Sequence, residues 1–190
     1  YRKMLETVKD LDIVTVSTPD HTHARAAIEA MKLGANVYVE KPLVRTLWES
    51  EYFKKTAKEC GVVTQMGNQG SSTDGMRRGV EILRSGILGN LTEVHVWTNR
   101  PEIFPGSTWG WKQPLMRPEG SDPIPAGFDW DCWLGTAPLR PFKKDVYHRI
   151  AWRAFYDFGT GAFGDMACHT MNLPFRGLEL GKVISGEALE

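Results

Sequence analysis

The feature that most constrains the fold is an alternation of short β-branched runs with helical patterns. Strand patterns occur at residues 12–19 (DIVTVSTP), 36–42 (NVYVEKP) and 62–69 (VVTQMGNQ), and helical patterns lie between them at 22–33 and 46–60. The first run is nearly all apolar and β-branched, which predicts a strand buried on both faces. Strands and helices joined in this order by short loops predict a parallel sheet with right-handed crossovers.

Local signals mark the ends of these elements. Thr46 and Glu49 have the spacing of a capping box, and Gly34 and Gly61 suit the ends of the two helices. In open parallel sheets, ligands lie beyond the carboxyl ends of the strands, so the three strand ends are expected to face one crevice. These ends are Thr18-Pro19-Asp20, Glu40-Lys41-Pro42 and Gly67-Asn68-Gln69. At such an end Lys41 is either a proton carrier in the crevice or a surface lysine after a turn.

The pattern changes after residue 74. A helix is predicted around Met76, Val80 and Leu83, ending at Gly86. The imperfect alternation of residues 91–99 (LTEVHVWTN) predicts a half-covered antiparallel strand. Residues 100–147 hold most of the prolines and tryptophans with little periodicity, and we interpret them as a long loop region of the kind that carries binding function. The tryptophans there either stack on sugars or belong to the core.

Residues 159–169 (GTGAFGDMACH) contain G-x-G-x-x-G, the spacing of a dinucleotide-binding loop. Such a loop follows a buried strand, whereas the preceding AWRAFYDF carries Arg153 and Asp157 and is not β-branched. The alternative is a turn that lets the backbone pack closely before a helix.

The predicted helix after this turn carries three polar side chains on one face. Asp165, His169 and Asn172 are spaced i, i+4 and i+7, so together they could bind a polar ligand and move a proton. The alternative is that Asp165 only caps the helix and His169 is a core histidine. Pro174 predicts a bend in this helix.

Composition excludes several partner classes. Lys+Arg and Asp+Glu both number 23, so neither nucleic acid nor an anionic membrane is an expected partner.

His21 and His23 form an H-x-H pair without further ligands, which favours contact with a cofactor or substrate over a metal site, and no metal is expected. The three cysteines form no C-x-x-C pair and favour a reducing, cytoplasmic compartment.

Five segments in one order resemble the Gfo/Idh/MocA family of oxidoreductases. They are STPDHTH, VYVEKPL, QMGNQ, DWDCWLGTAP and WRAFYDFGTGAFGDMACH. The resemblance implies an α/β fold: the C-terminal half of a Rossmann parallel sheet at residues 1–72, then the start of an α/β domain with a mostly antiparallel sheet at residues 73–190. It also implies that the chain is a fragment without the true glycine-rich loop, and that Gly159–Gly164 form the turn before the catalytic helix.

The resemblance further implies roles for individual residues. Lys41 would contact the cofactor ribose and the substrate hydroxyl, Asp165 would orient the substrate, and His169 would be the acid/base. Relatives commonly have Asp where this chain has Asn172, which puts one substrate hydrogen bond in doubt. The implied cofactor contacts are Thr18, Pro19, His23, Glu40, Lys41, Asn68, Trp152 and Arg153. The implied substrate contacts are Tyr147, His148 and Asn172.

The activity implied by the resemblance is hydride transfer between NAD or NADP and the hydroxyl or ketone of a sugar or polyol. Two alternatives stay open: an NAD-dependent glycoside hydrolase that uses a transient oxidation, and a dinucleotide-sensing regulator of the same fold. A full-length relative of this chain is expected to form homo-oligomers through its C-terminal sheet. The cytoplasmic expectation is itself open, because an export signal could precede Tyr1.

Overall fold

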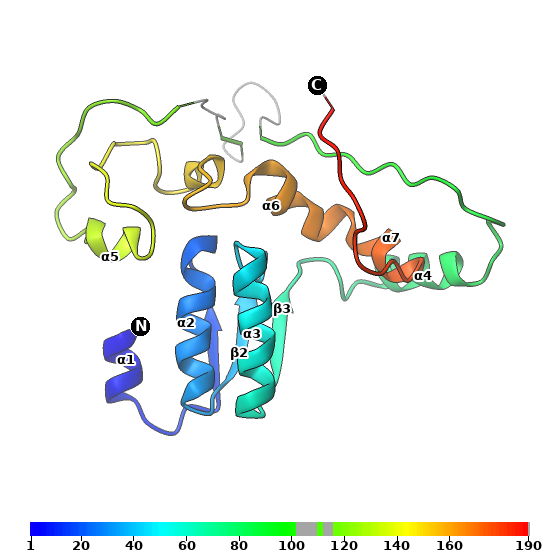
Figure 1. Ribbon diagram of the computed structural model, residues 1–190, viewed down its shortest axis with the longest axis horizontal. Coiled ribbons are helices and arrows are strands. Elements are labelled where there is room, and N and C mark those ends of the chain that lie inside the picture. The colour runs from blue at the N-terminus through cyan, green and yellow to red at the C-terminus, as the bar shows by residue number, and fades with distance from the viewer. Residues whose placement is uncertain (102–109, 112–115, 190) are drawn as a thin grey trace. The chain divides into compact units, whose positions relative to one another are not determined.

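The computed structural model describes residues 1–101, 110–111 and 116–189 (Figure 1). They form two compact units, of which the first contains Tyr1–Gly67 and Asn99–Met166 and the second Asn68–Thr98 and Ala167–Glu190. Each unit is described by itself below. The domain boundary predicted between residues 72 and 73 stays a prediction.

The first unit contains a three-stranded parallel sheet in the order β1-β2-β3. Its strands are β1 (Ile13–Val16), β2 (Asn36–Glu40) and β3 (Thr64–Gly67). In the register of the sheet Ile13 pairs with Asn36 and Val37 pairs with Thr64. The predicted parallel sheet is therefore confirmed, and its strands end at the residues that the sequence marks.

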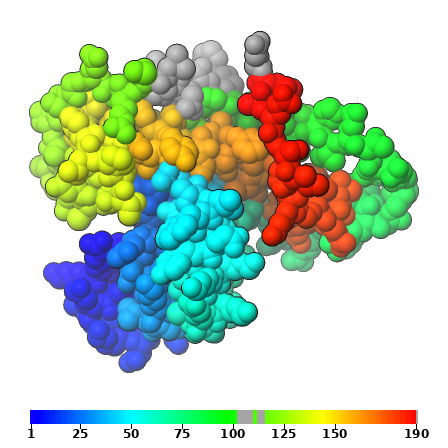
Figure 2. All heavy atoms as spheres, in the orientation of Figure 1, coloured from blue at the N-terminus to red at the C-terminus, as the bar shows by residue number. Residues whose placement is uncertain are grey.

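Helices α2 (Asp20–Lys32) and α3 (Leu47–Cys60) connect these strands and lie on the same face of the sheet (Figure 1), while α1 (Arg2–Thr7) precedes β1. The capping box at Thr46 and Glu49 is present, and Gly61 ends α3 with φ of 66°. The apolar faces of the helices pack against Val37 and Val39, and residues 1–67 fill space as one packed body, blue to cyan in Figure 2.

The other face of the sheet is not covered by the residues that the structure describes. Successive side chains of a strand point to opposite faces, so Val37 and Val39 are buried whereas Tyr38 between them is 41% exposed. Ile13 in β1 is 63% exposed. The prediction of a strand buried on both faces is therefore wrong for β1, because a run of apolar residues does not specify what lies on its second face.

Aromatic side chains build a second core in the same unit. Helix α5 (Trp130–Leu134) and the 3-10 helix η1 (Ala151–Ala154) contribute to it. Arg140, 9% exposed, stacks on Phe158 at 4.5 Å from the ring centroid and forms an ion pair with Asp157. Of the tryptophans in the loop region, Trp111 and Trp130 lie in this core, and Trp109 lies outside the described residues.

Helix α6 (Gly161–Thr170) runs from the first unit into the second, where α7 (Asn172–Gly177) packs against α4 (Asp74–Arg84). A Cβ added at Gly177 would lie 2.9 Å from Cβ and 3.1 Å from Cγ of Leu83, so the helices are in close contact there. The predicted break is present, but it lies at Met171 rather than at Pro174. Asn172 therefore begins a separate helix and does not share a face of α6 with Asp165 and His169.

Residues 91–99 form no strand, so the predicted antiparallel strand is wrong. A strand needs a neighbour that bonds its N–H and C=O groups, and no described residue pairs with this segment. Its apolar side chains remain partly exposed, as Val94 is at 48% and Trp97 at 80%. Assembly through a C-terminal sheet stays a prediction.

Candidate functional site

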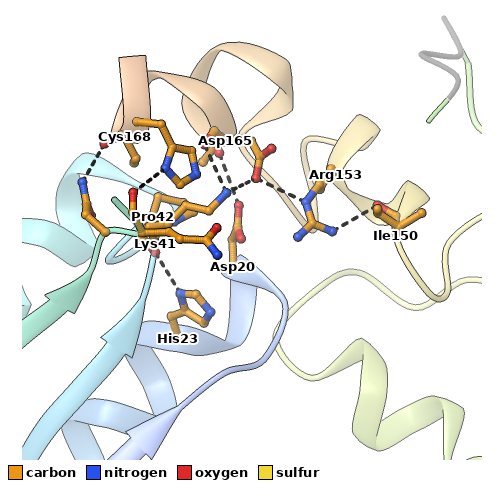
Figure 3. A network of polar contacts seen from close by, with 12 residues as sticks. Asp20, His23, Lys41, Pro42, Ile150, Arg153, Asp165 and Cys168 are labelled. Atoms are coloured by element: carbon orange, nitrogen blue, oxygen red, sulfur yellow. Dashed lines mark hydrogen bonds and ion pairs between the residues drawn. The ribbon is translucent and has the colours of Figure 1, made fainter. Parts of the chain in front are cut away.

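The site is built around an ion pair between Lys41 and Asp165 (Figure 3). Lys41 directly follows β2, and its side chain is 15% exposed. Its Nζ donates to Oδ1 of Asp165 at 2.6 Å and to the backbone oxygen of Asp165 at 3.2 Å. The lysine at the strand end is thus a half-buried cation held by α6, which excludes the alternative of a free surface lysine.

Arg153 holds the same carboxylate from the other side. Its Nε lies 3.2 Å from Oδ1 of Asp165 (Figure 3). Its guanidinium lies over the ring of Trp152, 4.2 Å from the ring centroid. Its Nη1 donates to the backbone oxygen of Ile150 at 3.4 Å. One buried carboxylate therefore bridges two cations from different segments, which fixes the positions of both.

The glycine turn makes this arrangement possible. A Cβ at Gly159 would lie 2.9 Å from Cα of Arg153, and Gly161 has φ of 66°, a conformation that other residues rarely adopt. The residues before Gly159 form η1 and a turn, not a strand. The structure thus supports the interpretation of a close-packing turn over that of a dinucleotide loop.

Asp20 is the main residue of the site that sequence reasoning missed. It is the first residue of α2, is 2% exposed, and accepts a hydrogen bond from Oγ1 of Thr160 at 3.3 Å. Burial raises the pKa of Asp20 to about 7, although Arg153 opposes this effect. The available signal was a carboxylate directly after a strand end, but the burial that shifts its pKa comes from residues far away in the sequence.

A pocket of about 340 Å³ lies among these residues. Seven of the residues that line it are expected from the sequence to contact cofactor or substrate: Thr18, Pro19, Glu40, Lys41, His148, Trp152 and Arg153. Four further lining residues have no such contact expected from the sequence: Ser17, Asp20, Trp133 and Arg149. The pocket therefore combines charged groups with two indole rings.

His23 lies outside the pocket lining and is only 1% exposed. Its Nδ1 is 2.8 Å from the backbone oxygen of Pro42, and its Nε2 is 2.7 Å from that of Thr18. Burial lowers the pKa of His23, against the effect of these two backbone oxygens. The ring connects the loops after β1 and β2, so His23 acts on the site through the backbone of Thr18 and Pro42. Its neighbour His21 is likewise buried, with Nε2 3.1 Å from the backbone oxygen of Trp133.

The two neighbouring residues of the predicted sugar site differ in exposure. Tyr147 is 2% exposed in the aromatic core, 4.8 Å from the ring of Phe155, and is not among the pocket residues. His148 is exposed, lines the pocket and lies 5.1 Å from the ring of Phe128. The position of His148 suits contact with a ligand, whereas Tyr147 supports the site through packing.

Three further predicted residues belong to the second unit. Nδ1 of His169 lies 3.3 Å from the backbone oxygen of Gln69, and Nδ2 of Asn68 donates to the backbone oxygen of Cys168 at 2.6 Å. Nδ2 of Asn172 donates to Oγ of Ser71 at 2.6 Å. The side-chain oxygens of Asn68 and Asn172 are buried and have no hydrogen-bond partner among the described residues. The joint action of His169 and Lys41 on one hydroxyl stays a prediction, because the two residues belong to different units.

The described part of the chain lacks both a membrane-spanning helix and a cluster of metal-binding residues. None of its helices combines the length and the apolar character that crossing a membrane requires. Nor do its His, Cys, Asp and Glu residues gather anywhere in a group of three or more that could hold a metal ion.

Family models match nearly the whole chain. Residues 1–68 match an oxidoreductase family described as having an NAD-binding Rossmann fold, and residues 77–178 match the C-terminal alpha/beta domain of the same oxidoreductase family. The three parallel strands lie within the first match.

Individual relatives are similar over shorter stretches. A 2,7-anhydro-N-acetylneuraminate hydratase of Mediterraneibacter gnavus is 28% identical over 46% of this chain and 23% of its own length. The NAD(+)-dependent scyllo-inositol 2-dehydrogenase of Bacillus subtilis is 40% identical over 30% of this chain and 17% of its own length. The structure of an inositol dehydrogenase homolog from Azotobacter vinelandii, complexed with NADH and myo-inositol, is 28% identical and covers 42% of this chain and 20% of its own, with a TM-score of 0.40. The matched stretches thus span less than a quarter of each relative.

Proposed function

Because the chain belongs to the Gfo/Idh/MocA family of NAD-binding oxidoreductases, we propose that it transfers hydride between a nicotinamide cofactor and a sugar or polyol. The cofactor is NAD or NADP, and the reacting group is a hydroxyl or the corresponding ketone. One observation carries the proposal: seven residues chosen from sequence surround a single pocket, in which Lys41 is fixed by Asp165. The names of the relatives, which include an NAD(+)-dependent inositol dehydrogenase, support a polyol as substrate.

The pocket residues fit the nicotinamide end of such a cofactor. Thr18 and Glu40 offer oxygen acceptors at two strand ends, Lys41 and Arg153 offer donors, and Trp152 offers an aromatic surface. When bound, the nicotinamide supplies the carbon that accepts or gives the hydride. Asn68, in the second unit, is a further proposed cofactor contact, because its unpartnered side-chain oxygen can accept a hydrogen bond from an amide donor.

In this proposal Lys41 stabilises the oxygen of the reacting alcohol. Hydride leaves the carbon readily only as the neighbouring hydroxyl loses its proton, so a cation at that oxygen lowers the barrier. The contact with Asp165 holds the ammonium group in place before substrate arrives, which avoids the cost of ordering a long side chain during the reaction.

His169 is the proposed acid/base, since an imidazole can accept the hydroxyl proton and return it near neutral pH. Asn172 is a proposed substrate contact. Its unpartnered oxygen can accept a hydrogen bond from a second hydroxyl of the sugar.

The test is to mix the full chain with NAD⁺ or NADP⁺ and a panel of sugars and polyols, myo-inositol included, and to follow reduced nicotinamide by absorbance. Lys41→Met and His169→Asn are each expected to lower kcat about 10²- to 10⁴-fold. His169→Asn is also expected to leave the Kd for dinucleotide within a few-fold, because of the two residues only Lys41 is a proposed cofactor contact. Lys54→Met, an exposed lysine in α3, is the matched control and is expected to leave the rate unchanged.

Absence of turnover with every compound, together with dinucleotide binding, would favour the regulator over the enzyme. Turnover that survives in both active-site variants would show that Lys41 and His169 have no part in the chemistry.

A further inference from the structure

Arg149 is the cation of the pocket that the proposed reaction does not use. It lines the pocket and is exposed, and its guanidinium has no ion pair or hydrogen bond with any described residue. The other two cations that line the pocket, Lys41 and Arg153, both bind Asp165. The guanidinium of Arg149 can therefore bind a ligand without leaving a carboxylate, whereas Lys41 and Arg153 are both bound to Asp165.

The backbone of Arg149 is nevertheless anchored. Its carbonyl oxygen accepts a hydrogen bond from Nε1 of Trp152 at 2.9 Å, and the indole of Trp152 lines the same pocket and carries the guanidinium of Arg153 at 4.2 Å. This tie joins Arg149 to the network that holds Asp165. The backbone from which the Arg149 side chain extends is thus held beside the residues that position Lys41.

The charges around the pocket are not balanced near neutral pH. Lys41, Arg149 and Arg153 are positive, and the nearby carboxyl groups are Glu40, Asp20 and Asp165. Because burial raises the pKa of Asp20 to about 7, this group is at least half protonated at and below that pH. Cations then outnumber ionised carboxylates, which favours a ligand that brings a negative charge of its own.

We propose that Arg149 selects a substrate that carries a carboxylate, so that the sugar oxidised or reduced at this site is an acidic sugar. This inference rests on the proposed function, because it takes the pocket as the place where substrate binds. A guanidinium presents two parallel N–H donors that match the two oxygens of a carboxylate. The indole rings of Trp133 and Trp152 offer apolar surfaces for the sugar ring beside it.

The same oxyanion chemistry would also suit a phosphate, either of a sugar phosphate or of the dinucleotide. We favour the carboxylate because one guanidinium can pair with both of its oxygens, whereas a phosphate group has three acceptor oxygens and Arg149 is one cation. The experiment below separates these sources.

The test is a titration of tryptophan fluorescence in the full chain without dinucleotide, since Trp133 and Trp152 line the pocket. The probes are glucuronate and galacturonate, each against its neutral parent sugar, together with glucose 6-phosphate and NAD⁺. At least one acid is expected to bind about tenfold or more tightly than its parent. Arg149→Gln is expected to remove this preference by weakening the acid about 10- to 100-fold, the usual effect of losing a hydrogen bond between charged groups.

Two further variants make the result specific. Arg149→Lys keeps the charge but loses the paired donors, so it is expected to fall between wild type and Arg149→Gln. Arg25→Gln removes an arginine that is exposed on α2, where it pairs with Glu29, and it is expected to change the binding of no probe.

The inference is overturned if neither acid is preferred over its parent, if glucose 6-phosphate binds more tightly than both acids, or if Arg149→Gln weakens NAD⁺ and not the acids. Because each sugar is titrated in the absence of dinucleotide, sugar binding is measured independently of hydride transfer. If acids bind through Arg149 but never reduce NAD⁺ or NADP⁺, the proposed reaction is refuted and the inference about Arg149 is not. Wild type that oxidises neutral polyols faster than the corresponding acids would refute the inference alone.

Discussion

Nζ of Lys41 lies 2.6 Å from Oδ1 of Asp165, although 124 residues of sequence separate the two. Their side chains are only 15% and 7% exposed, so water screens the pair weakly. Each partner keeps the other from being a buried, uncompensated charge. This dependence gives the first prediction.

Removing both partners of this pair is expected to destabilise the protein by less than the sum of the two single removals. Lys41→Met and Asp165→Leu should each lower the free energy of unfolding by about 3 kcal/mol, because each leaves a buried charge without its main partner. The free energy of unfolding lost in the double variant should be about 1–3 kcal/mol smaller than the sum of the losses in the two single variants. Urea unfolding of the four proteins measures this coupling, and strictly additive losses would contradict it.

Asp20 is expected to make stability fall as pH rises. Burial raises its pKa from 3.8 to about 7, so between these values the folded protein binds more protons than the unfolded chain. The free energy of unfolding therefore decreases through this window and is lowest above pH 7, by roughly 2–4 kcal/mol for this group. Asp20→Asn should flatten the slope and be more stable than wild type at pH 8.

Urea unfolding at several pH values between 4 and 8 checks this, with Asp10→Asn as an exposed control. An unchanged slope in Asp20→Asn would mean that this carboxyl ionises normally in the folded protein.

His23→Phe is expected to cost about 2–4 kcal/mol of stability. The phenyl ring has a similar size, but it leaves the buried backbone oxygen of Pro42 and the partly buried contact at Thr18 without the imidazole. Chemical unfolding measures the loss, and His95→Phe, an exposed histidine, is the control. A loss below about 0.5 kcal/mol would mean that water replaces the ring at both oxygens.

Gly177→Ala and Gly75→Ala are expected to change stability in opposite directions. A Cβ at Gly177 would lie 2.9 Å from Cβ of Leu83, too close to be relieved by a side-chain rotation, and the crowding should cost about 1–3 kcal/mol. A Cβ at Gly75 meets no atom within 4 Å, so alanine there should gain about 0.5 kcal/mol of helix propensity in α4. Thermal unfolding of the two variants gives the comparison, and equal melting temperatures would refute the close contact.

The elements that sequence predicts well are those whose signals are local. The three strands and the ends of α3 follow from β-branched runs, a capping box at Thr46 and a glycine at position 61, none of which depends on distant residues. The strand ends then indicate where Lys41 lies, because parallel strands share one edge.

The errors concern what a segment packs against. Residues 91–99 have an alternating pattern, but pattern alone supplies no neighbouring strand. Ile13 is apolar, yet its face of the sheet has no cover in the described part of the chain. For the site, the contact of Lys41 with Asp165 could be expected only from the family resemblance. The pKa of Asp20 is raised by burial, and the hydrogen-bond partner of this carboxyl, Thr160, is 140 residues away in the sequence, so no local pattern reveals the environment of Asp20.

Gly159 carries no side chain, yet it limits how far this protein could be redesigned. Its Cα faces Cα of Arg153 so closely that a single methyl group would displace the main chain carrying that arginine. A library of variants meant to change substrate choice can vary the exposed pocket residues His148 and Arg149 and should leave position 159 unchanged. This protein is therefore expected to tolerate mutation poorly at a position that has no functional group to lose.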